Sequence, residues 1–168
     1  MAAAAGLIAA AATLAAVLSL GAAPDSEGIR VAGQNGIVVR QVTESDCGLA
    51  AVATLARATG VDLPAYRALL AKYPPPSGGL SVAGIVAIGA ELGLPLDAVR
   101  VAAGGLATVP LPALVHLRAG HFVVLTARGP SQWTVADPAQ GMRAVAPVIF
   151  SGSASGAVLL LRQKSEVQ

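Results

Sequence analysis

The chain has little of several residue types, and each scarcity excludes a class of protein. Only one cysteine is present, so no intramolecular disulfide can form. That cysteine and two histidines lack ligand-like spacing, which excludes an ordinary zinc site, and no metal or organic cofactor is expected. Charged residues make up 12% of the 168 and aromatic residues 3%. Because no basic cluster is interleaved with aromatics, nucleic acid is not an expected partner.

The most apolar part of the sequence is its beginning. Residues 1–23 contain no charged side chain, and their centre, 7–20, is rich in alanine and leucine. This pattern is typical of a signal peptide or a membrane anchor, here assigned to residues 1–24, and a buried alanine-rich helix is the alternative. We therefore expect a bacterial protein that is exported (periplasmic or extracellular) or anchored, with residues 7–23 as its membrane contact. Residues 25–36 are polar and glycine-containing and are interpreted as a linker.

Residues 37–163 have the length of one domain, followed by a short tail at 164–168. Apolar spacing and turn residues predict three helices. The first begins after Ser45 or Asp46, either of which can cap it, and ends at Gly60. The other two span 62–71 and 82–92. Alternating patterns then predict strands at 113–117, 121–127, 132–136 and 157–161. Helices first and strands later indicate an α+β fold, with the N-terminal helices packed on an antiparallel sheet.

Cys47 falls in the first turn of the first predicted helix. A thiol there lies at the positive end of the helix dipole, which stabilises the thiolate, the form that attacks carbonyl groups. Gly48 follows and leaves space for a substrate. The position predicts a nucleophile, although a free cysteine can also be an inert core residue.

A predicted hairpin supplies a base for this nucleophile. The strands before and after Gly129 would bring His121 opposite Asp137, where a carboxylate can accept the imidazole N–H and orient the ring. The other histidine, His116, has no carboxylate mirrored across a turn and is interpreted as structural. Gln41, six residues before Cys47, is a candidate donor to the oxyanion of a tetrahedral intermediate, together with the Cys47 N–H.

Together these residues resemble the C39 peptidase family of bacteriocin-processing, double-glycine leader peptidases. The resemblance covers about residues 38–161 and is carried by QVTESDCGLA at 41–50, LPA at 111–113, HFVVL at 121–125 and ADPAQG at 136–141, with GLS at 79–81 and ELGL at 91–94 as weaker matches.

The resemblance implies a papain-like cysteine peptidase fold and a catalytic Cys47–His121–Asp137 triad with Gln41 as oxyanion donor. It implies a peptide or precursor-protein substrate, cut after a Gly-Gly pair, and a secretion machinery as partner. Two alternatives stay open, a non-cleaving domain that binds leader peptides and a papain-fold acyl or amide transferase. The sequence differs from family members fused to export transporters, since the 168 residues contain no transporter domain and begin with an export or anchor pattern.

Overall fold

The computed structural model describes residues 36–102 and 104–162. Its elements, in chain order, are α1 (Cys47–Ala58), α2 (Tyr66–Lys72), α3 (Val82–Glu91), β1 (Leu96–Arg100), the short 3-10 helix η1 (Gly105–Ala107), β2 (Ala113–Leu117), β3 (His121–Arg128), β4 (Trp133–Asp137), β5 (Gly141–Val145), α4 (Pro147–Ser153) and β6 (Ala154–Leu161). The predicted signal peptide or anchor, almost all of the predicted linker and the predicted tail lie outside the described residues. Within the described ranges, no helix combines the length and the apolar character that crossing a membrane requires.

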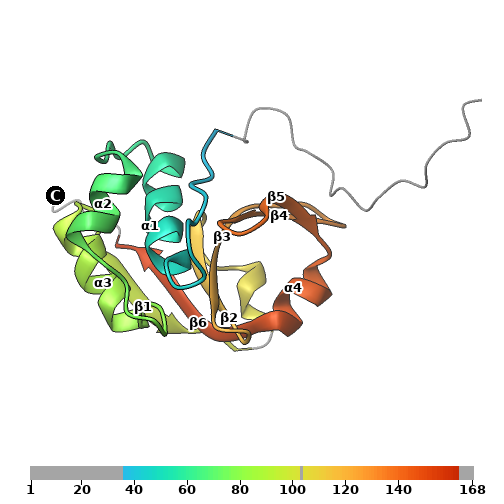
Figure 1. The fold of residues 1–168 in the computed structure, drawn as a ribbon. Helices are drawn as coiled ribbons and strands as arrows, with labels where there is room; N and C mark the ends of the chain where they lie inside the picture. The colour runs from blue at the N-terminus through green and yellow to red at the C-terminus, as the bar shows by residue number, and fades with distance from the viewer. Residues whose placement is uncertain (1–35, 103, 163–168) are drawn as a thin grey trace, which may run out of the picture.

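The six strands form one antiparallel sheet in the order β1-β6-β2-β3-β4-β5. Figure 1 shows α1, α2 and α3 grouped on one side of the molecule, with β4, β5 and α4 on the other. The predicted α+β class, with the N-terminal helices packed on an antiparallel sheet, is confirmed.

Helix α1 is the centre of the core on one face of the sheet. Ten of its twelve residues are buried, and the helix packs against β3. Its many alanines suit this position, because small side chains let a helix that is covered all round approach its neighbours closely. The opposite face of the sheet carries a second core, in which Trp133 of β4 meets Phe150 of α4 edge to face, with ring centroids 6.0 Å apart.

The first and third predicted helices are confirmed to within a residue or two. The third begins where expected, with the Ser81 hydroxyl accepting a hydrogen bond from the Gly84 N–H at 3.1 Å. The second begins later than predicted, at Tyr66 instead of residue 62. Residues 61–65 are irregular, since Pro64 disfavours helical backbone in the residue before it.

Two strands and one helix were not predicted from the sequence. Strands β1 and β5 are the two edges of the sheet, and β1 exposes three of its five residues. An edge strand with little burial carries no alternating apolar pattern, which is why these two segments gave no signal. Helix α4 leads directly into β6, which therefore begins at Ala154, three residues before the predicted start.

Candidate active site

Cys47 is the first residue of α1 and is almost completely buried. The packing of α1 on β3 brings the thiol against the first residues of that strand. Burial acts to raise the pKa of the Cys47 thiol, but hydrogen bonds with the His121 side chain and the Phe122 backbone, together with the imidazolium charge, lower it overall. The site therefore favours the thiolate.

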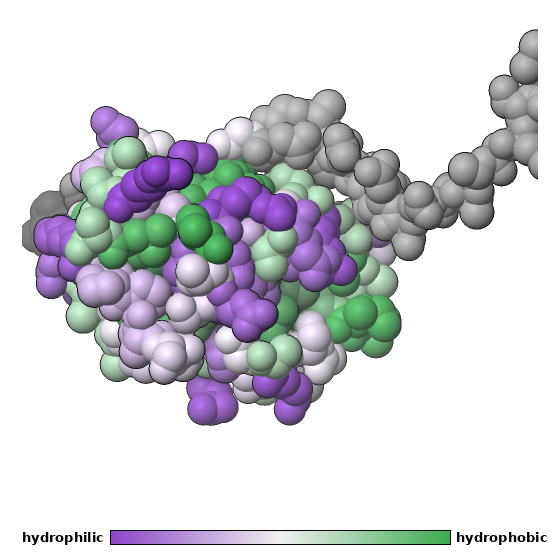
Figure 2. Space-filling view, viewed as in Figure 1, coloured by the Kyte–Doolittle hydropathy of each residue, from purple (hydrophilic) through white to green (hydrophobic). Residues whose placement is uncertain are grey.

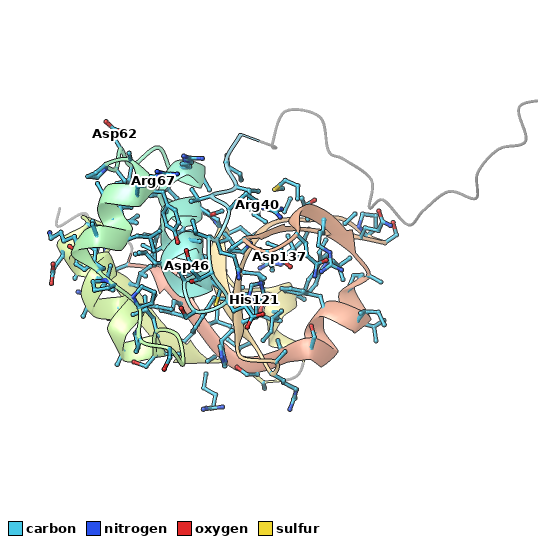
Figure 3. The ribbon with its side chains drawn as sticks, in the orientation of Figure 1. Arg40, Asp46, Asp62, Arg67, His121 and Asp137 are labelled. Carbon is cyan, nitrogen blue, oxygen red and sulfur yellow. The ribbon has the colours of Figure 1, made fainter. Side chains whose placement is uncertain are left out.

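His121 begins β3 and Asp137 ends β4. The imidazole Nε2 lies 2.8 Å from Oδ1 of Asp137, and Figure 3 shows the two side chains together. The hydrogen bond to Asp137, followed by the one to Cys47, raises the pKa of His121 to about 9 despite partial burial. Because Nε2 is engaged by the carboxylate, Nδ1 is the ring nitrogen left for the thiol.

Asp137 is buried and held by the turn that follows it. Its Oδ1 also accepts hydrogen bonds from the backbone N–H groups of Ala139, at 2.8 Å, and Gln140, at 3.3 Å. The guanidinium of Arg143 lies 3.5 Å from the other carboxylate oxygen. Burial acts to raise the pKa of Asp137, and the hydrogen bonds from His121 and the turn outweigh it and lower that pKa. The carboxylate thus stays ionised.

The predicted strand register was wrong in detail. His121 does not lie directly opposite Asp137, because the pair Val124↔Ala136 places Asp137 across from Val123, two residues further along β3. The pair Arg128↔Trp133 shows that the hairpin is centred beyond Gly129, and an irregularity between Leu125 and Ala127 changes the register by one residue. The offset of two residues keeps both side chains on one face, so the diagonal contact still forms.

Gln41 lies beside the turn that carries Asp137. Its backbone N–H donates to the Pro138 carbonyl at 3.1 Å, and its side-chain Nε2 donates to the Thr43 carbonyl at 2.8 Å. Its Oε1 is buried and has no hydrogen-bond partner among the described residues. One hydrogen of Nε2 is used by Thr43, which leaves the second available to a bound group.

The other histidine belongs to a different part of the sheet. Nδ1 of His116 lies 2.9 Å from the Ser155 hydroxyl, and the ring packs on Phe122 with centroids 4.6 Å apart. Desolvation lowers the pKa of His116, in contrast to His121. These contacts agree with a structural role.

Sequence reasoning missed the role of Asp46. It is the one of the two predicted cap residues, Ser45 and Asp46, that occupies the N-cap position of α1, but in the described part of the chain its side chain makes no capping hydrogen bond to the helix. The carboxylate instead accepts hydrogen bonds from the backbone N–H groups of Val42 and Thr43. The sequence around Asp46 has no pattern that predicts that its carboxylate points back toward Val42 and Thr43.

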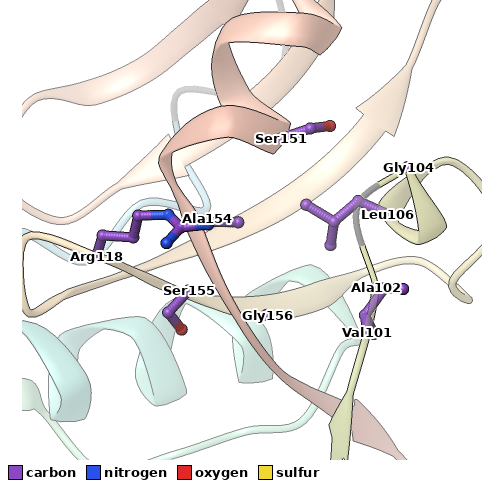
Figure 4. Close-up of a pocket in the computed structure, with 9 residues that line it drawn as sticks. All are labelled: Val101, Ala102, Gly104, Leu106, Arg118, Ser151, Ala154, Ser155 and Gly156. Atoms are coloured by element: carbon purple, nitrogen blue, oxygen red, sulfur yellow. The ribbon is translucent and has the colours of Figure 1, made fainter.

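A pocket separate from the candidate active site lies between the segment before η1 and the start of β6 (Figure 4). It is lined by Val101, Ala102, Gly104, Leu106, Arg118, Ser151, Ala154, Ser155 and Gly156, so it contains neither the cysteine nor the His121–Asp137 pair.

Comparison with known proteins shows which family the chain belongs to. The model of the peptidase C39 family matches residues 36–166. This chain belongs to the peptidase C39 family. Two curated Escherichia coli relatives are similar to it: the colicin V secretion/processing ATP-binding protein CvaB, 28% identical over 131 residues, and the probable microcin-H47 secretion/processing ATP-binding protein MchF, 31% identical over 108 residues. These matches cover 78% and 63% of the chain but only 19% and 15% of the relatives, so the chain spans less than a fifth of their length.

Solved C39 structures share the fold. A double glycine motif protease from an AMS/PCAT transporter, solved in complex with its leader peptide, superposes with a TM-score of 0.69 at 21% identity, covering 76% of this chain and 91% of that one. The peptidase domain of Streptococcus ComA gives 0.65 at 19% identity, covering 75% and 97%. The expected papain-like fold of the C39 peptidases is confirmed.

Proposed function

We propose that this C39 domain is a cysteine endopeptidase that hydrolyses a peptide bond. In this proposal Cys47 is the nucleophile, His121 the general base and acid, and Asp137 the group that orients the imidazole. The observation that carries it is the position of His121, whose Nε2 lies 2.8 Å from Asp137 while the same ring lowers the pKa of Cys47. A thiol whose pKa is lowered by a histidine that is itself bound to a buried carboxylate is typical of a catalytic site.

The opposed pKa shifts favour a thiolate–imidazolium pair as the resting state. The thiolate attacks the carbonyl carbon of the scissile bond, and a tetrahedral intermediate forms. His121 then gives its proton to the leaving amine, which departs and leaves a thioester on Cys47. His121 next removes a proton from water, which attacks the thioester and releases the acid.

Gln41 is the proposed side-chain donor to the oxyanion. The free hydrogen of its Nε2 and the Cys47 N–H at the start of α1 would bind the oxygen as it becomes negative. The bond from the Gln41 N–H to Pro138 supports this role, since it ties Gln41 to the turn that holds Asp137.

The proposed substrate is a peptide or precursor protein cut after a Gly-Gly pair. Support comes from relatives named as secretion and processing proteins and from a similar structure described as a double glycine motif protease bound to its leader peptide. By the same likeness we propose that the chain works beside a secretion machinery. Export or membrane anchoring through residues 1–24 remains a proposal based on their apolar composition.

The test is a cleavage assay. The purified chain is incubated with a peptide that contains one Gly-Gly pair, and products are identified by mass spectrometry. We expect one cut directly after the pair, no cut when the pair is replaced by Ala-Ala, and none with Cys47→Ala. Activity retained by Cys47→Ala would remove the nucleophile from its role.

The same assay separates the two alternative functions. Tight binding of the peptide to the wild-type chain without any product would identify a non-cleaving binding domain. Adding a primary amine and finding the N-terminal fragment joined to it in preference to water would identify a transferase, because the thioester then partitions to the amine.

A further inference from the structure

The carboxylate next to the nucleophile is fully buried and turned away from the helix it precedes. Asp46 has no exposed surface, and its side chain points back along the chain instead of capping α1. A buried carboxylate is costly unless donors surround it, so the groups that it binds indicate what it holds in place.

Those groups belong to two different segments. Oδ1 of Asp46 accepts the Thr43 N–H at 2.9 Å, and Oδ2 accepts the Val42 N–H at 3.0 Å. The hydroxyl of Tyr66, from the start of α2, donates to Oδ2 at 2.8 Å. Burial acts to raise the pKa of Asp46, but the backbone hydrogen bonds lower it overall, so the group accepts these bonds as a carboxylate.

The loop that Asp46 fixes is the one that carries Gln41. Val42 and Thr43 follow Gln41 directly, and the Thr43 carbonyl accepts the hydrogen bond from Gln41 Nε2 at 2.8 Å. On its other side, the Gln41 N–H donates to Pro138, at the turn after Asp137. Gln41 is therefore anchored at two points, and Asp46 controls one of them.

We propose that Asp46 is a positioning residue for the oxyanion donor: its side-chain oxygens, held by Tyr66, fix the loop at Val42 and Thr43 so that the Gln41 amide faces the reacting carbonyl. This inference rests on the proposed peptidase function. A donor that is fixed before the reaction needs no reorganisation when charge develops, which is why a second carboxylate beside the triad is useful.

Two probes of the same sulfur test the inference. A peptide aldehyde ending in Gly-glycinal adds the Cys47 thiol to its carbonyl carbon, and the former carbonyl oxygen, which takes up the thiol proton, lies where the oxyanion would. Iodoacetamide alkylates the thiolate with loss of iodide and has no oxyanion.

For Asp46→Ala we expect about tenfold or more loss of aldehyde affinity and of kcat, with KM little changed. The alkylation rate at pH 8 should stay within about twofold of the wild-type rate.

Graded variants separate positioning from general damage. Asp46→Asn keeps one oxygen for the backbone N–H groups and turns its amide toward the Tyr66 hydroxyl, which can accept, so it should recover most of the lost affinity. Tyr66→Phe should give an intermediate loss. Val158→Ala, which opens a cavity in the sheet away from this loop, controls for lowered stability and should leave both probes unchanged.

The outcomes are distinct. Unchanged aldehyde affinity in Asp46→Ala, or an equal fall in affinity and alkylation rate, overturns the inference. If Asp46→Ala does not fold, Tyr66→Phe decides, and wild-type affinity and kcat in that variant overturn it as well. A wild-type chain that neither binds the aldehyde nor shows an activated thiol would instead refute the proposed function itself.

Discussion

At the scale of single residues, the lowered pKa of Cys47 and the raised pKa of His121 predict the pH dependence of thiol reactivity. Iodoacetamide should alkylate Cys47 well below the ordinary thiol pKa of about 8.5, because the imidazolium stabilises the thiolate. His121→Gln should return the onset of alkylation to higher pH. His116→Gln is the matched control, since that ring bonds to Ser155, and its profile should equal that of the wild type. Identical profiles for the two variants would contradict the pairing.

A second prediction concerns Asp137. The alkaline limb of cleavage activity should report the loss of the His121 proton at about pH 9, since the attacking pair needs imidazolium as the acid. Asp137→Asn replaces the carboxylate whose hydrogen bond contributes most to that raised pKa, so the alkaline limb should move to lower pH and kcat should fall. The exposed Asp62→Asn is the control. An unmoved limb in Asp137→Asn would show that the carboxylate does not set the imidazole pKa.

At the scale of elements, Gly89 is the position where α3 meets the chain entering β1. A Cβ there would lie 2.8 Å from the Leu94 carbonyl oxygen and 2.9 Å from a Leu96 methyl carbon. Gly89→Ala should therefore lower the free energy of unfolding by about 1–3 kcal/mol through overpacking. Gly78→Ala, where a Cβ would meet nothing within 4 Å, should change it by less than about 0.5 kcal/mol. Urea denaturation compares the two, and equal midpoints would contradict the close approach.

The same scale shows what could be predicted from the sequence. Helices α1 and α3 and strands β2 and β3 carry their apolar period and turn residues locally, and α3 also carries its cap at Ser81, so their bounds were close to correct. The edge strands β1 and β5 carry no such pattern, because each buries only one of its five side chains, and the pairing partner of β1, β6, lies far along the chain.

Some features of the candidate site could likewise be predicted from the sequence, and others could not. Cys47 at a helix start, and a histidine and an aspartate on neighbouring strands, are visible as spacing. Their convergence depends on α1 packing against β3, and the family resemblance, not periodicity, indicated it. The register irregularity near Thr126 has no local sequence signal, and the Tyr66 hydroxyl that binds the Asp46 carboxylate comes from α2, a tertiary contact that local patterns do not encode.

At the scale of the whole molecule, two buried carboxylates should make the free energy of unfolding depend on pH in the acid range. Asp46 and Asp137 both have lowered pKa values in the folded chain. A group with a depressed folded pKa contributes stability that is present above its unfolded pKa, about 3.9, and is lost as pH falls through the folded value. We therefore expect the free energy of unfolding to fall steeply below about pH 4.

Substitution should reveal the two contributors. Asp46→Asn and Asp137→Asn should each flatten the fall in stability below about pH 4, because one carboxylate no longer takes up a proton on unfolding. Asp62→Asn removes an exposed carboxylate and should keep the wild-type slope. Urea midpoints measured from pH 7 to pH 3 provide the comparison, and equal slopes in all four proteins would contradict the assignment.

The helices pack along the sheet, α1 against β3 and α3 against β1, and the proposed site lies where the start of α1 meets β3. Cys47 comes from the helices, whereas His121 and Asp137 come from the sheet (Figure 1). On the face shown in Figure 2, hydrophilic and hydrophobic residues are interspersed. The convergence of two halves on one sulfur is the feature on which the proposed hydrolysis depends.

The most direct measurement is therefore the kcat/KM for a Gly-Gly peptide in His121→Gln compared with His116→Gln. If His121 joins Cys47 to Asp137, the first variant should lose at least about a hundredfold in kcat/KM. The second should stay close to the wild-type value, since its ring contacts Ser155 and Phe122. Equal losses in the two variants, or no loss in His121→Gln, would contradict the account.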